Sequence, residues 1–150
     1  MTITCGIYLY DLTRKQFIIC HATHASWNQW SIPKGLKEKN EDTLTAATRE
    51  LWEETGIKAA DLHIIDTHIL APVKYMKRNK TIESFLVITD TSLTDFKPQC
   101  KTFIKGGFPE IDNWKWVDID TMAKMVHESQ KENIPLIKKL LSHAGTNSTQ

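Results

Sequence analysis

The sequence predicts an α/β or α+β layer fold with a mixed β-sheet. The order of the segments supports this class, because two strand-like stretches precede one strongly patterned helix, further strands follow it, and two helices end the sequence. Length supports it as well, since 150 residues suffice for one domain with a sizeable core. We therefore expect a single domain over residues 1–145 and a flexible tail at residues 146–150.

The first segments are two strands joined by a short turn. Residues 2–10 are rich in β-branched and aromatic side chains, residues 11–15 form the turn, and residues 17–20 return as a second strand. The polar stretch 21–29 is expected to be a loop. Because this loop leads directly toward the patterned helix, we expect it to form a pocket wall, with His24 among the substrate-binding residues.

A helix is predicted over residues 43–55. Asp42 occupies the N-cap position, and Gly56 occupies the C′ position at which many helices end in a left-handed conformation. Apolar and small residues recur at helical spacing within this segment and are expected to face the core. These residues are Leu44, Ala47, Leu51 and Thr55.

Three glutamates of the same helix suggest a metal site. Glu50, Glu53 and Glu54 are spaced i, i+3 and i+4, so a helix places their carboxylates on a different face from the apolar residues. Clustered carboxylates repel one another, and oxygen-rich clusters suit Mg²⁺ or Mn²⁺. Arg49, one turn before Glu53, can pair with a carboxylate and orient it. The alternative interpretation of the three glutamates is a solvated acidic helix face.

The spacing of residues around this helix is highly specific. It follows the pattern G-x5-E-x7-R-E-L-x-E-E-x-G-I, which resembles the Nudix box of the Nudix hydrolases at every specified position. The matching residues are Gly35, Glu41, Arg49, Glu50, Leu51, Glu53, Glu54, Gly56 and Ile57. The resemblance implies the Nudix fold, a mixed β-sheet sandwiched between helices, with the box as a loop–helix–loop catalytic motif. It also implies hydrolysis of a nucleoside diphosphate linked to another moiety, with Mg²⁺ or Mn²⁺ as cofactor.

The same resemblance implies roles for individual box residues. Glu53 and Glu54 are catalytic candidates, because one of the box carboxylates is expected to double as the general base. Arg49 would orient carboxylates rather than react, and Glu41 would be an outer ligand. The implied metal ligands within the box are Gly35, through its carbonyl oxygen, Glu50, Glu53 and Glu54.

The approach to the box contains candidate substrate contacts. Residues 30–35, WSIPKG, resemble the W-x-x-P-K-G segment of Nudix enzymes that act on dinucleoside polyphosphates. Pro33 fixes its own φ angle, and Gly35 permits a conformation in which its carbonyl can point at a metal ion. We expect Lys34 to contact phosphate and Trp30 to contact substrate, with core packing as the alternative role of Trp30.

A strand and a basic loop follow the helix. Residues 62–70 alternate well enough for a strand, and residues 71–80 form a loop rich in lysine and arginine. Lys77 and Arg78 are candidate phosphate contacts beside Tyr75, whose ring could stack on a base. The alternative is a solvated basic loop.

The remainder is expected to contain one buried strand, one half-buried strand and two helices. Residues 84–89 form a continuous apolar run typical of a central strand. Residues 90–107 contain Pro98 and two glycines and are expected to form a mobile lid. A strand follows within residues 108–118, then a short helix near residues 121–127, and a final helix has Asn133 as its N-cap and Pro135 in its first turn.

One further carboxylate is expected to reach the metal site from outside the box. Residues 109–117, PEIDNWKWV, resemble the P-E-x-x-x-W-x-W-V segment of bacterial RNA pyrophosphohydrolases and diadenosine polyphosphate hydrolases. This resemblance implies that Glu110 is a catalytic residue and a metal ligand on the opposite wall. Asp112 and Glu83 are alternatives for that role, and a plain loop glutamate is the structural alternative.

Composition limits the other possibilities. Basic and acidic residues nearly balance, 19 against 18, so we expect no strong net electrostatic field that would attract nucleic acid or a membrane surface. The three widely spaced cysteines are expected to be free thiols, which fits a reducing cytoplasm. No signal peptide and no apolar stretch of the ~20 residues that a membrane span needs is found. We expect a cytoplasmic protein without a membrane partner, and monomer and homodimer both remain open.

Several substrates are compatible with these motifs. Dinucleoside polyphosphates are favoured by residues 30–35 and by the later tryptophan pair. The 5′ end of RNA is the next candidate, although RNA enzymes of this kind usually have P-Q-G-G where this chain has Pro33-Lys34-Gly35-Leu36. ADP-ribose, nucleotide sugars and nucleoside triphosphates are further alternatives. The non-enzyme alternative is a catalytically silent Nudix nucleotide-binding module, which a turnover assay distinguishes.

Overall fold

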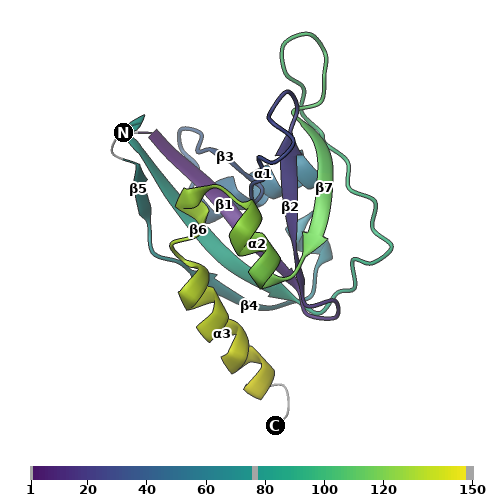
Figure 1. Cartoon of the computed structure of the whole chain (residues 1–150), viewed down its shortest axis with the longest axis vertical. Coiled ribbons are helices and arrows are strands. Elements are labelled where there is room, and N and C mark those ends of the chain that lie inside the picture. The colour runs from purple at the N-terminus through teal and green to yellow at the C-terminus, as the bar shows by residue number, and fades with distance from the viewer. Residues whose placement is uncertain (1, 76–77, 148–150) are drawn as a thin grey trace.

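A computed structural model describes residues 2–75 and 78–147, with side chains as far as residue 144. Its strands and helices follow the predicted order, with two short strands added (Figure 1). The strands are β1 (Thr2–Asp11), β2 (Gln16–Ala22), β3 (Lys34–Leu36), β4 (Ile64–Ile69), β5 (Val73–Tyr75), β6 (Lys80–Thr89) and β7 (Ile111–Val117). The helices are α1 (Thr43–Thr55), α2 (Ile119–Met125) and α3 (Ile134–Asn147), with 3₁₀ turns η1 (Ala59–Asp61) and η3 (Glu128–Gln130).

The strands form one mixed sheet in the order β4-β6-β1-β2-β7. β1 and β6 run parallel along their whole length, from Thr2 opposite Lys80 to Asp11 opposite Thr89, whereas the other pairs are antiparallel. β1 uses its other edge twice, pairing with β3 near its start and with β2 near its end. β2 and β3 therefore pair with different stretches of the same edge of β1.

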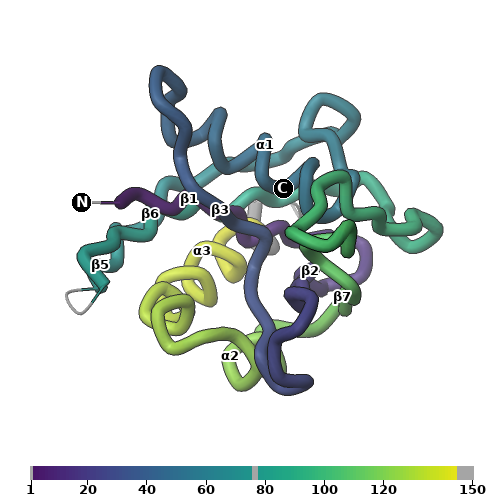
Figure 2. Tube along the Cα trace, turned by 90° about the horizontal axis from the view of Figure 1, so that it is seen from above, coloured from purple at the N-terminus to yellow at the C-terminus, as the bar shows by residue number. Residues whose placement is uncertain are grey.

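Helices cover both faces of the sheet. Alternate residues of β1 point to opposite faces, as strand geometry requires. Ile7 and Leu9 belong to the core cluster packed under α1, while Tyr8 and Tyr10 belong to the cluster packed under α2 and α3. Viewed from above, α1 lies on one side of β1 and the two later helices lie on the other (Figure 2). The predicted mixed sheet between helices is confirmed.

Some local predictions need correction. Two three-residue strands, β3 and β5, were not expected, and β5 lies inside the predicted basic loop. α2 begins earlier than expected, because the Asp118 side chain caps it by accepting a hydrogen bond from the Thr121 N–H. The Asn133 side-chain amide donates to the Ala71 carbonyl at 2.9 Å, which ties the start of α3 to the chain before β5. At the chain end, α3 includes residues 146 and 147, and residues 148–150 lie outside the described residues.

The long connection between β6 and β7 is not a lid over the site. Its backbone N–H groups at Gln99 and Lys101 donate to the carbonyls of Thr55 and Glu53, at 3.0 and 2.6 Å. These bonds satisfy two of the carbonyl groups that the last turn of any helix leaves without intrahelical partners. The connection is therefore fixed along the C-terminal end of α1. None of the described helices is both long and apolar enough to cross a membrane.

Candidate active site

The box helix is capped as predicted, but its buried face is wider than expected. The Asp42 side chain accepts a hydrogen bond from the Thr45 N–H, and Gly56 is left-handed, with its N–H bonded to the Trp52 carbonyl. Leu44 was expected to face the core and is 41% exposed, whereas Ala46 is fully buried. The buried face extends around the helix to Glu50 and Glu54, which are 6% and 5% exposed. Two of the three carboxylates are therefore not on a solvated face.

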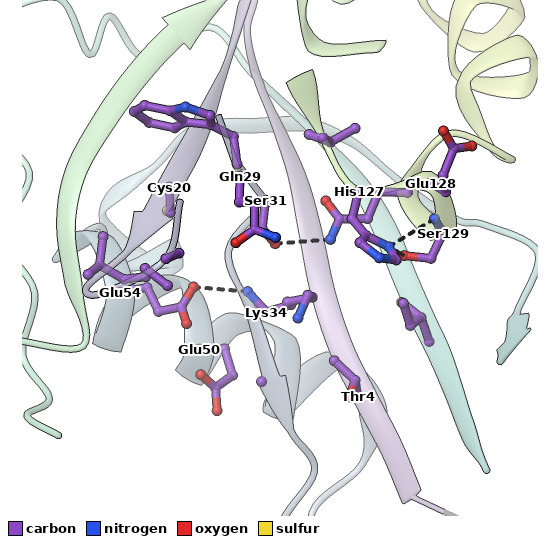
Figure 3. Close-up of a pocket in the computed structure, with 18 of the residues that line it drawn as sticks. Thr4, Cys20, Gln29, Ser31, Lys34, Glu50, Glu54, His127, Glu128 and Ser129 are labelled. Atoms are coloured by element: carbon purple, nitrogen blue, oxygen red, sulfur yellow. Dashed lines mark hydrogen bonds between the residues drawn. The ribbon is translucent and has the colours of Figure 1, made fainter. Parts of the chain in front are cut away.

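Glu54 lies against the strand that precedes the box helix. The Lys34 backbone N–H donates to Glu54 Oε1 at 3.1 Å, which fixes the carboxylate beside β3 (Figure 3). The Trp114 indole N–H donates to the Glu54 backbone carbonyl at 2.8 Å, so β7 also holds this turn of the helix. Burial, followed by the nearby Glu110 charge, raises the pKa of Glu54 well above its usual value.

Glu50 occupies a space that only glycine leaves open. A Cβ atom built on Gly35 would lie 2.1 Å from the Glu50 carboxyl carbon, so any side chain at this position would displace the carboxylate. Burial raises the pKa of Glu50 to about 7, with the Glu53 charge contributing, despite the opposing effect of Arg49. The glycine of the box is therefore required by the close approach of β3 to a buried acid.

Arg49 binds several acids at once. Its guanidinium contacts Glu41 Oε1 at 2.6 Å, Glu50 Oε1 at 2.9 Å and Glu53 Oε2 at 3.1 Å, and it donates to the Leu36 carbonyl at 2.9 Å. The bonds to Glu41 raise the pKa of Arg49, and the same bonds lower the pKa of Glu41. This arrangement fixes the carboxylates and closes the box loop onto the helix, and the role of Arg49 in catalysis stays a prediction.

Glu110 immediately precedes β7 and lies beside the box carboxylates. It lines the same cavity as Glu50 and Glu54, and its charge contributes to the raised pKa values of both. The Thr102 hydroxyl donates to Glu110 Oε2 at 2.9 Å. Asp112, an alternative for this role, is instead bonded to His21 at 2.6 Å. Glu83, the other alternative, pairs with Cys5 across the sheet and is not among the cavity-lining residues.

A cavity of about 1110 Å³ connects the box to the far side of the sheet. One end is acidic. The other contains mainly cationic, aromatic and hydroxyl groups, with one carboxylate, from β5, the start of β6 and the chain between them, and from the end of α2 and the segment that follows it. Figure 3 shows Glu50 and Glu54 on one side, His127 and Ser129 on the other, and Lys34 between them. The acidic end is formed by Glu50, Glu54 and Glu110, and the opposite end by Tyr75, Arg78, Lys80, Lys124, His127, Glu128 and Ser129.

The predicted substrate-binding residues are only partly gathered at this cavity. Trp30, Lys34, Tyr75 and Arg78 line it. His24 does not, because it packs edge-on against Phe108, with 5.2 Å between ring centroids. Lys77 lies outside the described residues. Glu53 and Arg49 contact each other, and neither residue lines the cavity.

Sequence reasoning missed the cavity-lining residues at the end of α2 and just after it. Lys124 and His127 both line the cavity. The Gln130 side chain holds their segment against the chain before β3. It accepts a hydrogen bond from the Ile32 N–H at 2.9 Å and donates one to the Ser31 hydroxyl at 3.0 Å. His127 Nδ1 accepts from the Ser129 N–H and forms a short hydrogen bond with the Tyr75 hydroxyl. These contacts join residues far apart in sequence, so no local pattern predicts them.

The donor set suits a hard divalent cation that keeps some of its own water. Within residues 2–75 and 78–147, no three Asp, Glu, His or Cys side chains converge closely enough to hold an ion by themselves. Mg²⁺ commonly binds one or two carboxylates, water and substrate phosphates rather than a complete protein cage. The buried carboxylates of Glu50 and Glu54 repel each other and Glu110, so a cation here would relieve an unfavourable concentration of charge.

Comparison with known proteins identifies the family. A family model of the NUDIX domain matches residues 2–140. The chain belongs to the Nudix family. An RNA pyrophosphohydrolase from Bartonella henselae is 29% identical over 128 residues, which cover 79% of this chain and 73% of that protein. The m7GpppN-mRNA hydrolase of Saccharomyces cerevisiae is 25% identical over 127 residues, which cover 83% of this chain but 11% of that protein.

Solved structures agree on the fold. A C. elegans Ap4A hydrolase in a binary complex superposes with a TM-score of 0.73 at 22% identity, covering 93% of this chain and 98% of that one. The expected Nudix fold is thus confirmed. The chain is a Nudix pyrophosphohydrolase, an enzyme that acts on phosphorus anhydrides. Nudix proteins generally use divalent metal ions such as Mg²⁺ or Mn²⁺.

Proposed function

We propose that this Nudix enzyme cleaves dinucleoside polyphosphates with Mg²⁺ or Mn²⁺ as cofactor. The main support is the shape and charge of the cavity. At about 1110 Å³ it exceeds the ~300–1,000 Å³ typical of sites for one small ligand. Its acidic end suits a metal-bound pyrophosphate, and its cationic end suits further phosphates and a second nucleoside. A substrate with nucleosides on both sides of a polyphosphate would use both ends.

The acidic end would hold the metal ion and the reacting phosphates. Glu50, Glu54, Glu110 and the Gly35 carbonyl are the proposed ligands from the cavity lining. When bound, the ion neutralises phosphate charge and lowers the pKa of its water for in-line attack on phosphorus. Glu53, proposed from the family resemblance as ligand or base, is oriented by Arg49 at 3.1 Å. Glu54 is the better candidate for the base, because its carboxylate faces the cavity.

The opposite end would bind the second half of the substrate. Arg78, Lys80 and Lys124 offer positive charge to phosphate oxygens. Tyr75 offers an aromatic face to a base. His127 Nδ1 accepts the Ser129 N–H, so in the neutral ring Nε2 carries the proton and can donate to the ligand. Lys34, which lies between the two ends (Figure 3), would contact the central phosphates.

A second candidate substrate is the 5′ end of RNA. The similarity to proteins named RNA pyrophosphohydrolase and m7GpppN-mRNA hydrolase favours it, and the PEIDNWKWV segment supports it. The chain has Pro33-Lys34-Gly35-Leu36 in place of the P-Q-G-G usual in such RNA enzymes. The lysine side chain adds positive charge where those enzymes have an amide, which suits a longer polyphosphate. We therefore place RNA second.

A substrate panel tests the proposal. Diadenosine tetraphosphate, 5′-triphosphorylated RNA, ADP-ribose and ATP would be incubated with enzyme and Mg²⁺ or Mn²⁺, with products resolved chromatographically and Glu54→Gln as the inactive control. We expect the highest kcat/KM on diadenosine tetraphosphate. The highest value on triphosphorylated RNA would establish the second candidate instead. Tight nucleotide binding without turnover of any member would indicate a silent binding module.

A further inference from the structure

The chain between β2 and β3 forms one wall of the cavity and is closed at its base by backbone hydrogen bonds. Cys20 and Ser31 exchange two such bonds, at 2.7 and 3.0 Å. Beyond this base, residues of the loop line the cavity, among them Ala25, Asn28 and Gln29. Polar loops of this length have several accessible conformations unless side chains restrain them. The position of this wall therefore depends on the contacts that hold the loop.

His21 supplies a restraint that uses both of its ring nitrogens. Nδ1 lies 2.6 Å from Asp112 Oδ1 on β7, and Nε2 lies 2.9 Å from the Ser26 backbone carbonyl. Both partners are acceptors, so both hydrogen bonds form only when the ring has two N–H groups and is an imidazolium. His21 thus joins β7 to the middle of the loop. The side chain is buried and does not itself line the cavity.

Further contacts transmit this restraint to Trp30. The His21 ring packs against the Trp30 ring at 5.3 Å between centroids. The Trp30 indole N–H donates to the Trp27 carbonyl at 3.0 Å, and the Gln29 N–H donates to the same Ser26 carbonyl that His21 binds, at 2.9 Å. The loop from Ser26 to Trp30 is therefore held as a unit, with His21 beneath it.

We propose that His21 is a positioning residue for substrate binding. Its imidazolium, held by Asp112, fixes the Ser26 carbonyl and with it the wall against which the substrate packs. The inference rests on the proposed function, because it assigns the loop to substrate binding rather than to the chemical step. It also explains why Asp112 is unavailable to the metal site: its carboxylate is engaged by His21.

The test measures kcat and KM on diadenosine tetraphosphate for His21→Gln, Asp112→Asn and the double variant. Glutamine cannot span both acceptors, so KM should rise about tenfold in His21→Gln, the scale of one lost charge-assisted hydrogen bond, while kcat stays within about twofold. Because the two residues act through one contact, the double variant should be no worse than the poorer single variant. His63→Gln is the matched control, since His63 forms a similar pair with Asp90 at 2.7 Å outside the cavity.

Hydrogen exchange provides a second readout on the same variants. Amides of Ala25 and Gln29 should exchange faster in His21→Gln, while amides of β1 keep their protection. Should His21→Gln fail to fold, Asp112→Asn alone decides the matter by the same criteria. An unchanged KM, a loss confined to kcat, or additive effects in the double variant would overturn the proposal. If the wild-type enzyme hydrolyses no member of the substrate panel, the proposed function is wrong. If the wild-type enzyme hydrolyses diadenosine tetraphosphate and His21→Gln has the same KM, only the positioning role of His21 is rejected.

Discussion

At the scale of single residues, the site depends on how closely the chain approaches its buried acids. Gly35 shows this most directly, because a Cβ atom at this position would lie 2.1–2.3 Å from the carboxyl atoms of Glu50. The atoms in the way are the end of a side chain, so a methyl group would push the carboxylate aside rather than unfold the protein. The consequence should be loss of function with little loss of stability.

We therefore predict that Gly35→Ala lowers kcat by about 10²-fold, the scale of losing one electrostatic catalytic group. The melting temperature should stay close to that of the wild type, as differential scanning calorimetry would show. Gly107→Ala, where an added Cβ meets nothing within 4 Å, is the control and should keep full activity. A Gly35→Ala enzyme with wild-type kcat would show that the Glu50 carboxylate is not needed in its observed position.

At the cationic end of the cavity, Tyr75 and His127 form a hydrogen-bonded pair, with 5.5 Å between ring centroids. If Tyr75 stacks on a base, Tyr75→Ala should raise KM by an amount equivalent to ~1–3 kcal/mol of binding free energy. The value of kcat should change little, because the lost contact stabilises the bound substrate and the transition state equally. Tyr75→Phe keeps the ring and should retain most of the affinity. Steady-state kinetics on diadenosine tetraphosphate measures both. Equal KM values for wild type and Tyr75→Ala would return this residue to a surface role.

At the scale of elements, α1 illustrates what a sequence can predict. Its caps and length follow from local rules, and both were predicted from Asp42 and Gly56. The extent of its buried face was not, because Glu50 and Glu54 are covered by β3 and β7, which come from elsewhere in the chain. β3 and β5 escaped prediction for a similar reason: three residues contain too little pattern, and only pairing with β1 and β6 makes them strands.

Much of the site was accessible from the sequence, and the rest required tertiary structure. The box acids are close in sequence on one helix, so their clustering follows from helical spacing. Glu110 was predicted from the family resemblance of residues 109–117 and from its position before the tryptophan-containing strand. Lys124, His127 and the His21 contact with Asp112 depend on how α2 and β7 pack, which no local periodicity encodes.

The C-terminal end of α1 gives a prediction at this scale. Gly56 has φ +79°, and an added Cβ would lie 3.2 Å from the Gln99 carbonyl oxygen. Gly56→Ala should lower the free energy of unfolding by about 1 kcal/mol from backbone strain, with an added cost from the tight contact. In Gly107→Ala the backbone strain is similar, at φ +83°, but the added Cβ meets no atom within 4 Å, so the free energy of unfolding should fall less than in Gly56→Ala. Chemical denaturation compares the two, and a Gly56→Ala protein as stable as wild type would contradict the left-handed cap.

At the scale of the whole molecule, the buried acids link stability to pH and metal. A carboxyl group whose pKa is higher in the folded than in the unfolded state favours folding while it is protonated, so its contribution is lost as pH rises. For Glu50 the loss begins near the unfolded value of 4.5 and is complete above about 7, and for Glu54 the shift has the same direction. For Glu50 the expected decrease in the free energy of unfolding over this pH range is on the order of 3 kcal/mol.

In EDTA, the wild-type protein should therefore melt at a lower temperature at pH 8 than at pH 6. His21 has a raised pKa, through its bond to Asp112, and contributes with the same sign. The informative comparison is thus between the change in melting temperature from pH 6 to pH 8 in the wild type and the same change in Glu50→Gln. This change should be smaller in Glu50→Gln, because glutamine does not ionise. Added Mg²⁺ should restore wild-type stability at pH 8. Identical pH profiles for the two proteins would mean that Glu50 is not destabilising when charged.

The central claim is that Glu50, Glu54 and Glu110 hold a divalent metal ion that the hydrolysis requires. Calorimetric titration with Mn²⁺, followed by turnover of diadenosine tetraphosphate in the same samples, tests it on wild type, Glu54→Gln and Glu110→Gln. We expect saturable Mn²⁺ binding and metal-dependent turnover in the wild type. Both variants should bind Mn²⁺ more weakly and lose about 10²-fold or more in kcat with the fold intact. Undiminished hydrolysis in excess EDTA, or wild-type Mn²⁺ affinity and kcat in Glu54→Gln, would contradict the account.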